Sequence, residues 1–194
     1  MIIINSSQQD TMKIFRPFSR INVPIGLGYL ISVLEREKIT VGFIDEQTAG
    51  NTFALVAEYI KEKEPPYIFG FSVLTAAIKR SIIVSERLKE LYPDSVIIFG
   101  GIHPTAVPEE VLSYKHVDIV LRGEAEETLP QLYRCLKKRG SFSHIEGISF
   151  RQNGGIIHNN AAPVVKDLDS LPPFPYHLFD SGEYDLGAII SSRG

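Results

Sequence analysis

The chain has 194 residues, of which 44% are hydrophobic and 22% are charged, and its formal net charge is −3. This composition is typical of a folded globular domain and excludes a disordered chain or a fibre. The 20 basic and 23 acidic side chains are nearly balanced and include no long basic run. We therefore expect no nucleic acid and no membrane among its partners, because neither would find an electrostatic attachment site.

Three further features bear on where in the cell the protein is located. The longest apolar stretch, residues 23–34, contains two glycines, a tyrosine and a serine, and is too short to cross a bilayer. The amino-terminal MIII segment lacks the basic region and cleavage site of a secretory signal. Cys135 is the only cysteine, which excludes an internal disulfide and an all-cysteine metal or iron–sulfur site in this sequence. We expect a cytoplasmic location.

Short apolar, β-branched runs alternate with helical patterns from the first residue to about residue 140. The runs predict strands at residues 1–4, 40–44, 67–71, 95–99 and 117–121. Because these runs are apolar throughout, we expect helices on both faces of the sheet. The predicted fold is α/β, a doubly wound, Rossmann-like or flavodoxin-like sheet of five parallel strands.

The segments between these strands carry the spacing of amphipathic helices. Apolar residues at intervals of three and four predict helices over residues 27–34, 53–60, 78–91 and 129–136. A short additional helix is expected to begin at Pro108, because proline suits the first turn. The last long helix ends in three cations before Gly140, which we assign as the glycine of its C-terminal cap.

The pattern changes after Gly140. Two short β runs, residues 145–151 and 156–159, flank an Asn-Gly-Gly turn at residues 153–155, which predicts a β-hairpin. We expect this hairpin as an appendage of the α/β domain.

A proline-rich segment follows the hairpin. Residues 166–184 place three prolines among acidic and aromatic side chains, which is typical of an extended, semi-rigid linker. A further strand and turn are expected at residues 188–194, so we expect the chain to be truncated before another domain. The expected units are residues 1–141, 142–165 and 166–194.

Ligands of open parallel α/β sheets bind beyond the carboxyl ends of the strands. The predicted strands are followed by polar or glycine residues, namely Asn5, Asp45, Ser72, the Gly100-Gly101 pair and the Gly123-Glu124 pair. Because turns favour glycine and small polar residues, any one of these strand ends is explained by its turn. Five such strand ends in one sheet are less readily explained in that way. The paired glycines would let a bulky flat group approach the backbone. Neither a GxGxxG nor a GxxxxGK[ST] motif is present, so a nucleotide site lacks its signature.

Three of these segments resemble the motifs of the cobalamin-binding domain, in the same order and strand context. Residues 45–50 (DEQTAG) match D-x-H-x-x-G with Asp45, Gln47 and Gly50. Ser72 and Leu74 match S-x-L, and residues 100–105 (GGIHPT) match the G-G motif. The resemblance covers residues 1 to about 140.

Other segments look like the N-terminal domains of cobalamin-dependent radical S-adenosylmethionine enzymes. They are residues 24–30, 108–110 and 123–128, the linker at 167–172, and residues 191–194, which resemble the approach to the C-x-x-x-C-x-x-C loop. Within this group the chain is most similar to the anaerobic magnesium-protoporphyrin monomethyl ester cyclase type.

The resemblance implies cobalamin as the cofactor of this domain. It also implies a C-terminal radical S-adenosylmethionine domain in the same polypeptide, with a [4Fe-4S] cluster and S-adenosylmethionine, that modifies an unactivated carbon by methyl transfer or oxidative cyclisation. Such clusters are held mainly by cysteine thiolates, and Cys135 is alone. We therefore expect that the parent protein is an enzyme and that the 194-residue chain alone catalyses no reaction.

Gln47 departs from the family pattern, because the lower cobalt ligand in D-x-H-x-x-G is histidine and an amide is a poor cobalt ligand. The resemblance then implies that the dimethylbenzimidazole tail leaves cobalt and enters the sheet crevice, with no histidine in its place. Gln47 would hold a water beneath cobalt, fill the lower face, or be an ordinary loop residue.

Other candidate residues also have two interpretations. Ser72 either bonds the buried tail or caps the following helix, and His103 either approaches the ribose or phosphate or fixes a His-Pro turn. Glu124 is either a site residue or a charge that complements a helix amino terminus.

The sequence is also compatible with two other functions. A cobalamin-fold domain without cofactor could serve in substrate recognition or docking, which Gln47 favours. A flavodoxin-like domain or a response-regulator relative could bind another ligand, although the acidic cluster and late lysine of response regulators are missing.

Overall fold

The structure is a computed structural model that describes residues 1–7 and 21–187. Its strands are β1 (Ile2–Asn5), β2 (Ile21–Asn22), β3 (Gly42–Asp45), β4 (Ile68–Ser72), β5 (Val96–Gly100), β6 (Ile119–Leu121), β7 (Ile148–Gln152), β8 (Gly155–His158) and β9 (Tyr184–Asp185). Its α-helices are α2 (Ile25–Arg36), α3 (Thr52–Ile60), α4 (Ile78–Leu91), α5 (Ile102–Ala106), α6 (Pro108–Ser113) and α7 (Thr128–Lys137). Short 3-10 turns are η2 (Thr75–Ala77), η3 (Leu168–Ser170) and η4 (Tyr176–Leu178). The strand and turn expected at 188–194 lie outside the described residues.

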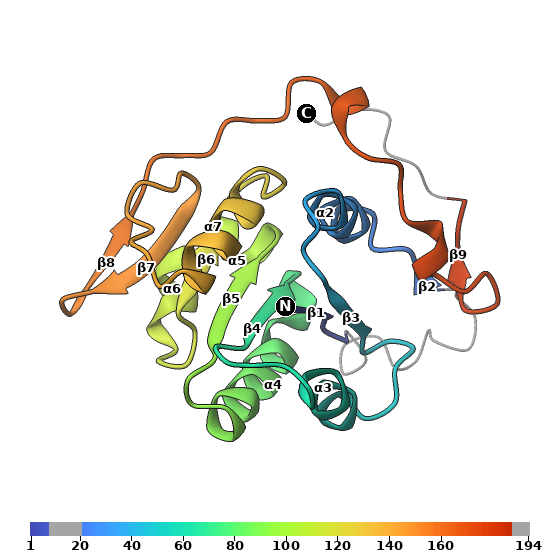
Figure 1. Cartoon of the computed structure of the whole chain (residues 1–194), viewed down its shortest axis with the longest axis horizontal. Helices are drawn as coiled ribbons and strands as arrows, with labels where there is room; N and C mark the ends of the chain where they lie inside the picture. Colours follow the sequence, from blue (N-terminus) through green and yellow to red (C-terminus); the bar gives the residue numbers. More distant parts are fainter. Residues whose placement is uncertain (8–20, 188–194) are drawn as a thin grey trace.

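The central sheet has the order β3-β1-β4-β5-β6-β7-β8 (Figure 1). The five predicted strands are the first five in this order, and all of them run parallel. The chain moves outward from β1 in one direction to β3 and in the other to β4. The doubly wound fold is therefore confirmed, with its topological switch point between β1 and β4.

The hairpin corrects the expected strand count. β7 pairs antiparallel with β6, so the hairpin adds two strands to the same sheet and makes it seven-stranded. Ile148 and Phe150 are buried in the core, which explains why β7 covers the edge of β6 instead of standing apart. The predicted turn is confirmed, because Asn153 and Gly154 both have positive φ, 52° and 81°, as a two-residue hairpin turn requires.

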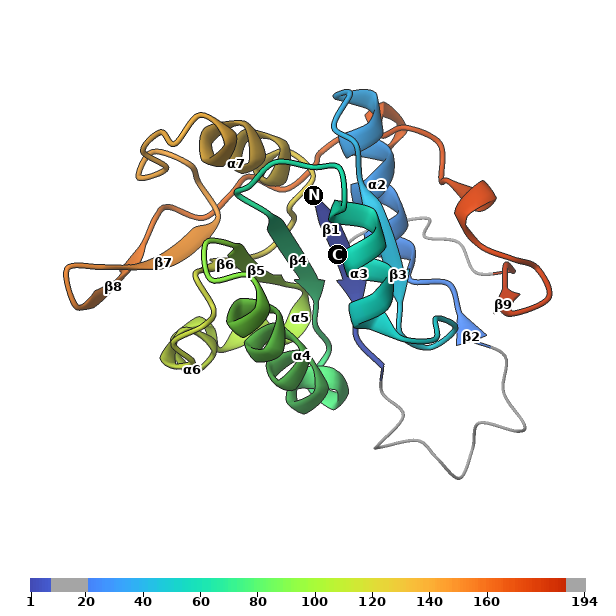
Figure 2. The same ribbon diagram turned by 60° about the horizontal axis from the view of Figure 1, so that its bottom comes forward.

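Alternate residues of each parallel strand enter two apolar layers. Ile2 and Ile4 pack with α3, α4 and α6, whereas Ile3 packs with α2 and α7 on the other face (Figure 2). This is the period-two alternation of a strand, and it accounts for the continuously apolar sequence runs. Within the described ranges, no helix combines the length and the apolar character that a membrane crossing requires.

The end of α7 differs by one residue from the expected cap. Arg139, with φ of 51°, takes the left-handed position, and Gly140 follows it. The Arg139 N–H donates to Leu136 O at 3.0 Å and the Gly140 N–H to Cys135 O at 2.9 Å, which is the Schellman pattern. The helix therefore runs one residue shorter than the glycine rule predicts.

The proline-rich segment is extended apart from η3 and η4, and it crosses over α2 toward β2 (Figure 1). Ser32 Oγ donates to Pro173 O at 2.8 Å, and Arg36 Nη1 donates to Ser170 O at 2.9 Å. The Phe174 ring lies directly on Gly28. The segment then pairs with β2 through the short parallel strand β9. The extended conformation predicted for residues 166–184 is confirmed, and the segment packs on the domain. We keep the name linker for this segment.

We predict that Gly28→Ala displaces the linker. A Cβ at position 28 would lie 2.2 Å from Phe174 Cε2, so the ring must leave α2. Amide hydrogen exchange over residues 170–180 should accelerate in this variant.

Gly26→Ala in the same helix is the matched control, because a Cβ there meets nothing within 4 Å. It should leave linker exchange unchanged and raise the free energy of unfolding by up to about 1 kcal/mol. Equal linker exchange in both variants would contradict the packing of Phe174 on Gly28.

Candidate functional site

Four neighbouring strands end at the same level at one edge of the sheet. The register pairs Asn5 with Asp45 and with Ser72, and it pairs Ser72 with Gly100. We call this row of four residues the carboxyl edge. Asn5 and Ser72 stand on the two sides of the switch point, where the crevice of a doubly wound sheet opens. The structure thus brings four of the predicted site residues together.

Asp45 is the most connected member of the carboxyl edge, and its side chain is buried. Its Oδ2 accepts from Asn5 Nδ2 at 3.0 Å and from the Tyr184 hydroxyl at 2.9 Å, while its Oδ1 accepts from the Gln47 N–H at 2.9 Å. Thr48 Oγ1 lies 3.2 Å from the same tyrosine oxygen. A carboxylate with three donors is well compensated for its burial.

Glu46 fixes the same loop from the other face of the sheet. Its carboxylate accepts from Arg80 Nε at 3.1 Å and Nη2 at 2.7 Å, and from the Thr52 hydroxyl at 2.8 Å. The Ser7 N–H approaches it at 3.3 Å. Asp45 and Glu46 therefore attach the start of the loop of residues 45–50 to β1, α3 and α4. Gly50, at the other end of this loop, is exposed.

The β4 and β5 ends are joined by their backbones. The Val73 N–H donates to Gly100 O at 2.8 Å, and the His103 N–H donates to Val73 O at 3.3 Å. Gly101 has φ of 103°, and a Cβ there would lie 2.9 Å from Val73 O. A Cβ at Gly100 would make only ordinary contact, 3.5 Å from Leu121 Cβ. The two glycines thus differ: the backbone at Gly101 requires glycine, whereas Gly100 has room for a Cβ.

Ser72 does not cap a helix. The cap positions of η2 and α4 are Leu74 and Ala77, so the capping interpretation of Ser72 is wrong. Beyond the edge, two large apolar side chains are exposed, Leu74 at 44% and Ile102 at 72%. Ile102 begins α5, a short helix where a fixed His-Pro turn was expected. Together these side chains offer an apolar surface on which a flat ring could rest.

Two residues that directly follow the carboxyl edge or Ile102 carry buried polar atoms without a partner among the described residues. These atoms are Ser6 Oγ and His103 Nε2, and His103 Nδ1 is 3.3 Å from Thr75 Oγ1. Such atoms cost free energy unless a ligand or water satisfies them. The donor set, the missing side chain at Gly100 and the exposed apolar residues fit a large flat cofactor with polar substituents.

Gly123 and Glu124 lie at the end of β6 and make other contacts. Gly123, with φ of 74°, donates its N–H to Thr105 Oγ1 at 3.0 Å. Glu124 Oε2 accepts the Val165 N–H at 2.5 Å, so this carboxylate holds the residue just before the linker.

Several residues of this region were not predicted. Tyr184 and Thr48 complete the Asp45 network. Ser6 contributes a hydroxyl that has no partner among residues 1–7 and 21–187, and Ile102 contributes an exposed apolar side chain. Ser6 and Thr48 sit in loops that the sequence already marked, so loop position could have found them. Tyr184 lies 139 residues from Asp45 and carries no local signal.

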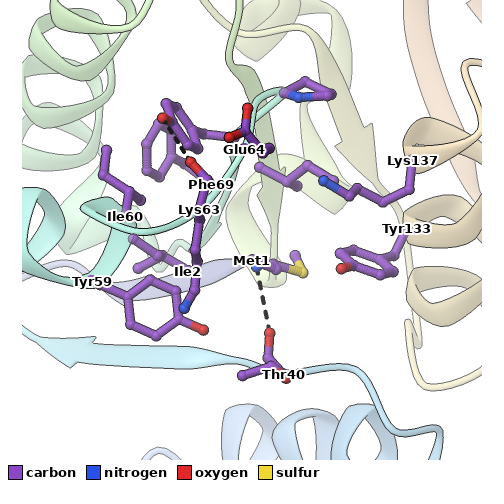
Figure 3. Close-up of a pocket in the computed structure, with 13 residues that line it drawn as sticks. Met1, Ile2, Thr40, Tyr59, Ile60, Lys63, Glu64, Phe69, Tyr133 and Lys137 are labelled. Carbon is purple, nitrogen blue, oxygen red and sulfur yellow. Dashed lines mark hydrogen bonds between the residues drawn. The ribbon is translucent and has the colours of Figure 1, made fainter.

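A separate cavity of 230 Å³ lies at the opposite, amino edge of the sheet (Figure 3). Lys63 Nζ lies 3.4 Å from the centroid of the Tyr59 ring, and the Met1 amino group is 3.4 Å from Thr40 O. Burial, together with nearby Lys63 and Lys137, lowers the pKa of the Met1 amino group to about 6. This cavity shares no residue with the carboxyl edge.

The contrast between the two glycines gives a stability prediction. Gly101→Ala should lower the free energy of unfolding by about 1–3 kcal/mol, because the backbone conformation and the Val73 contact both exclude a Cβ. Gly100→Ala should change it by less than about 1 kcal/mol. Chemical denaturation measures both. Equal losses would contradict the different roles assigned to the pair.

Comparison with known proteins connects this geometry to a family. Residues 16–133, more than half of the chain, match the B12 binding domain family. An uncharacterized methyltransferase of Pyrococcus horikoshii is 30% identical over 88% of the chain and 38% of its own length. The anaerobic magnesium-protoporphyrin IX monomethyl ester cyclase of Cereibacter sphaeroides is 31% identical over 77% of the chain and 25% of its own length. The chain thus spans well under half of these relatives.

Solved structures agree. The cobalamin-dependent S-adenosylmethionine radical enzyme OxsB, with aqua-cobalamin and S-adenosylmethionine bound, superposes with a TM-score of 0.63 at 25% identity, covering 84% of this chain and 22% of that one. TsrM from Kitasatospora setae, with cobalamin and a [4Fe-4S] cluster bound, shares the fold at TM-score 0.64 and 18% identity, over 89% and 30%. The resemblance stated from the motifs is confirmed: the chain belongs to the B12 binding domain family.

Proposed function

We propose that the carboxyl edge binds cobalamin with the dimethylbenzimidazole tail inserted beside β4 and β5 and with no protein histidine on cobalt. The observation that carries this proposal is the alignment of Asn5, Asp45, Ser72 and Gly100 at one level across the switch point. Ser72 supplies a hydroxyl next to Gly100, its partner in the strand register, which has no side chain. Leu74 and Ile102 would lie against the corrin ring, and His103 Nε2 and Ser6 Oγ would find partners on its side chains.

The side chain at position 47 supports the absence of a histidine ligand. Gln47 occupies the motif position of the lower ligand, and its N–H is held by Asp45 Oδ1 at 2.9 Å. Histidine is absent from residues 45–50, and an amide side chain binds cobalt poorly. In this proposal Gln47 stands beneath the corrin without coordinating the metal.

The wider function rests on the relatives. Cobalamin, when bound, would supply cobalt-centred group transfer or electron transfer, while these residues hold and orient it. We propose that a radical S-adenosylmethionine domain of the same polypeptide, with its [4Fe-4S] cluster, modifies an unactivated carbon by methyl transfer or oxidative cyclisation. In that arrangement residues 1–141 bind the cofactor, 142–165 extend the sheet, and 166–194 lead to the radical domain.

A second function has one observation in its favour. The family ligand position holds Gln47, which suits a domain of the same fold that has lost its cofactor and acts in substrate recognition or docking. The binding experiment below separates the two, because the docking domain would retain no cobalamin.

The purified chain should bind hydroxocobalamin in a visible-spectrum titration and retain it through gel filtration. Gly100→Leu should weaken this binding about tenfold or more, because the new side chain fills the space proposed for the tail. Cobinamide, which lacks the nucleotide tail, should bind the variant and the wild type equally.

Gly155→Leu is the matched control, because Gly155 is an exposed strand glycine of the hairpin, where a Cβ meets only Gln152 O at 3.8 Å. It should bind both ligands as the wild type does. Loss of cobalamin from the wild type on the column contradicts the proposal, and equal binding by Gly100→Leu contradicts the tail position.

The axial ligand can be tested by electron paramagnetic resonance of the cob(II)alamin complex. We expect no superhyperfine splitting from an axial nitrogen in the wild type, because Gln47 replaces the family histidine. Gln47→His should introduce the splitting, whereas Gln47→Asn should not. An axial-nitrogen signal in the wild type that persists with an isotopically distinguished dimethylbenzimidazole would contradict the proposal.

A further inference from the structure

We infer that Tyr184 is a positioning residue that couples the linker to cofactor binding: it fastens the linker to the loop of residues 45–50. The inference rests on the proposed function, because that loop is the segment expected beneath the corrin. We call the Tyr184 contacts with Asp45 and Thr48 the latch. The motifs at residues 45–50, 72–74 and 100–105 do not include this tyrosine.

The geometry of the latch is specific. The Tyr184 hydroxyl donates to Asp45 Oδ2 at 2.9 Å and lies 3.2 Å from Thr48 Oγ1. The phenol donates its one proton to the Asp45 carboxylate, so the contact with Thr48 uses the threonine proton. Thr48 Oγ1 shares that proton with Asp45 O, 3.4 Å away. Asp45 and Thr48 flank Gln47, whose N–H is bound by the other oxygen of Asp45. The linker therefore holds both sides of the residue placed beneath cobalt.

The tyrosine is held firmly at this place. It is 3% exposed and packs edge-on against Phe179, with ring centroids 5.2 Å apart. It also begins β9, whose partner β2 leads directly into α2. Burial raises the pKa of Tyr184 above its ordinary value, so the phenol stays protonated and remains a donor at neutral pH.

The latch requires reciprocal coupling. If a docked linker orders residues 45–50 for the cofactor, then bound cofactor must favour the docked linker by the same factor. If Tyr184 only filled space in the core, docking of the linker would not depend on whether the cofactor is bound. The coupling gives the domain a physical means of linking cofactor occupancy to the position of its linker.

The test compares Tyr184→Phe with the wild type. The variant keeps the ring and its contact with Phe179, so the fold should be preserved, and only the latch is removed. Tyr176→Phe is the matched control, because Tyr176 is a 46% exposed tyrosine of the same linker outside the Asp45 network. Hydrogen–deuterium exchange is followed over residues 45–50 and 176–187, without ligand and with saturating hydroxocobalamin.

Without ligand, Tyr184→Phe should accelerate exchange in residues 45–50, and Tyr176→Phe should not. With hydroxocobalamin, residues 176–187 should gain protection in the wild type and lose that gain in Tyr184→Phe. The variant should bind both hydroxocobalamin and cobinamide roughly fivefold more weakly, because the loop contacts the corrin and not the tail. This pattern differs from that of Gly100→Leu, which affects cobalamin alone.

The outcomes separate the latch from the proposed function. Failure of the wild type to bind either ligand overturns the proposed function and the cofactor coupling with it. Binding by the wild type with equal affinity in Tyr184→Phe, or with no added protection of residues 176–187, overturns the latch and leaves cobalamin binding standing. Unchanged exchange of residues 45–50 in the unliganded variant also overturns the latch.

Discussion

A buried carboxylate at the end of β3 organises the region on which function depends. Asp45 receives hydrogen bonds from Asn5 on β1, from the backbone of Gln47 and from Tyr184 at the far end of the chain. Removing any donor would leave part of a buried charge uncompensated. The switch point, the loop and the linker therefore share one electrostatic centre, and their positions depend on one another.

Steric constraints complete this arrangement. Gly101 lets β5 turn against the Val73 backbone, and Gly28 lets Phe174 lie on α2. In both places an added methyl group would push apart two segments that are distant in the sequence. These glycines allow two segments to approach closely and are not sites of flexibility. Gly101 thereby positions the end of β5, and Gly28 positions the linker.

The fold could be predicted from the sequence because its signals are local. The apolar strand runs, the helical spacing and the Asn153-Gly154 turn each depend on neighbouring residues, and the structure confirms them. The pairing of β7 with β6 could not be predicted, because a hairpin pattern does not say which edge it joins. Arg139 shows a similar limit, since hydrogen bonding, and not residue type, decided where α7 ends.

The candidate site, too, contains residues that the sequence predicts and residues that it does not. Asn5, Asp45, Ser72 and Gly100 follow from strand ends, because parallel strands bring their carboxyl ends to one edge. The engagement of Glu124 with Val165 and of Tyr184 with Asp45 depends on how the linker folds back, which no local pattern encodes. Glu124 illustrates that a motif position identifies a residue and not the partner it contacts.

The most direct test of the central claim is a crystal structure of the chain with hydroxocobalamin. We expect the corrin over Leu74 and Ile102, the nucleotide tail beside Ser72 and Gly100, and Gln47 beneath a lower face of cobalt that carries no protein ligand. Cobalamin bound elsewhere, for example at the amino-edge cavity beside Tyr59 and Lys63, would contradict it. So would a histidine nitrogen bonded to the metal.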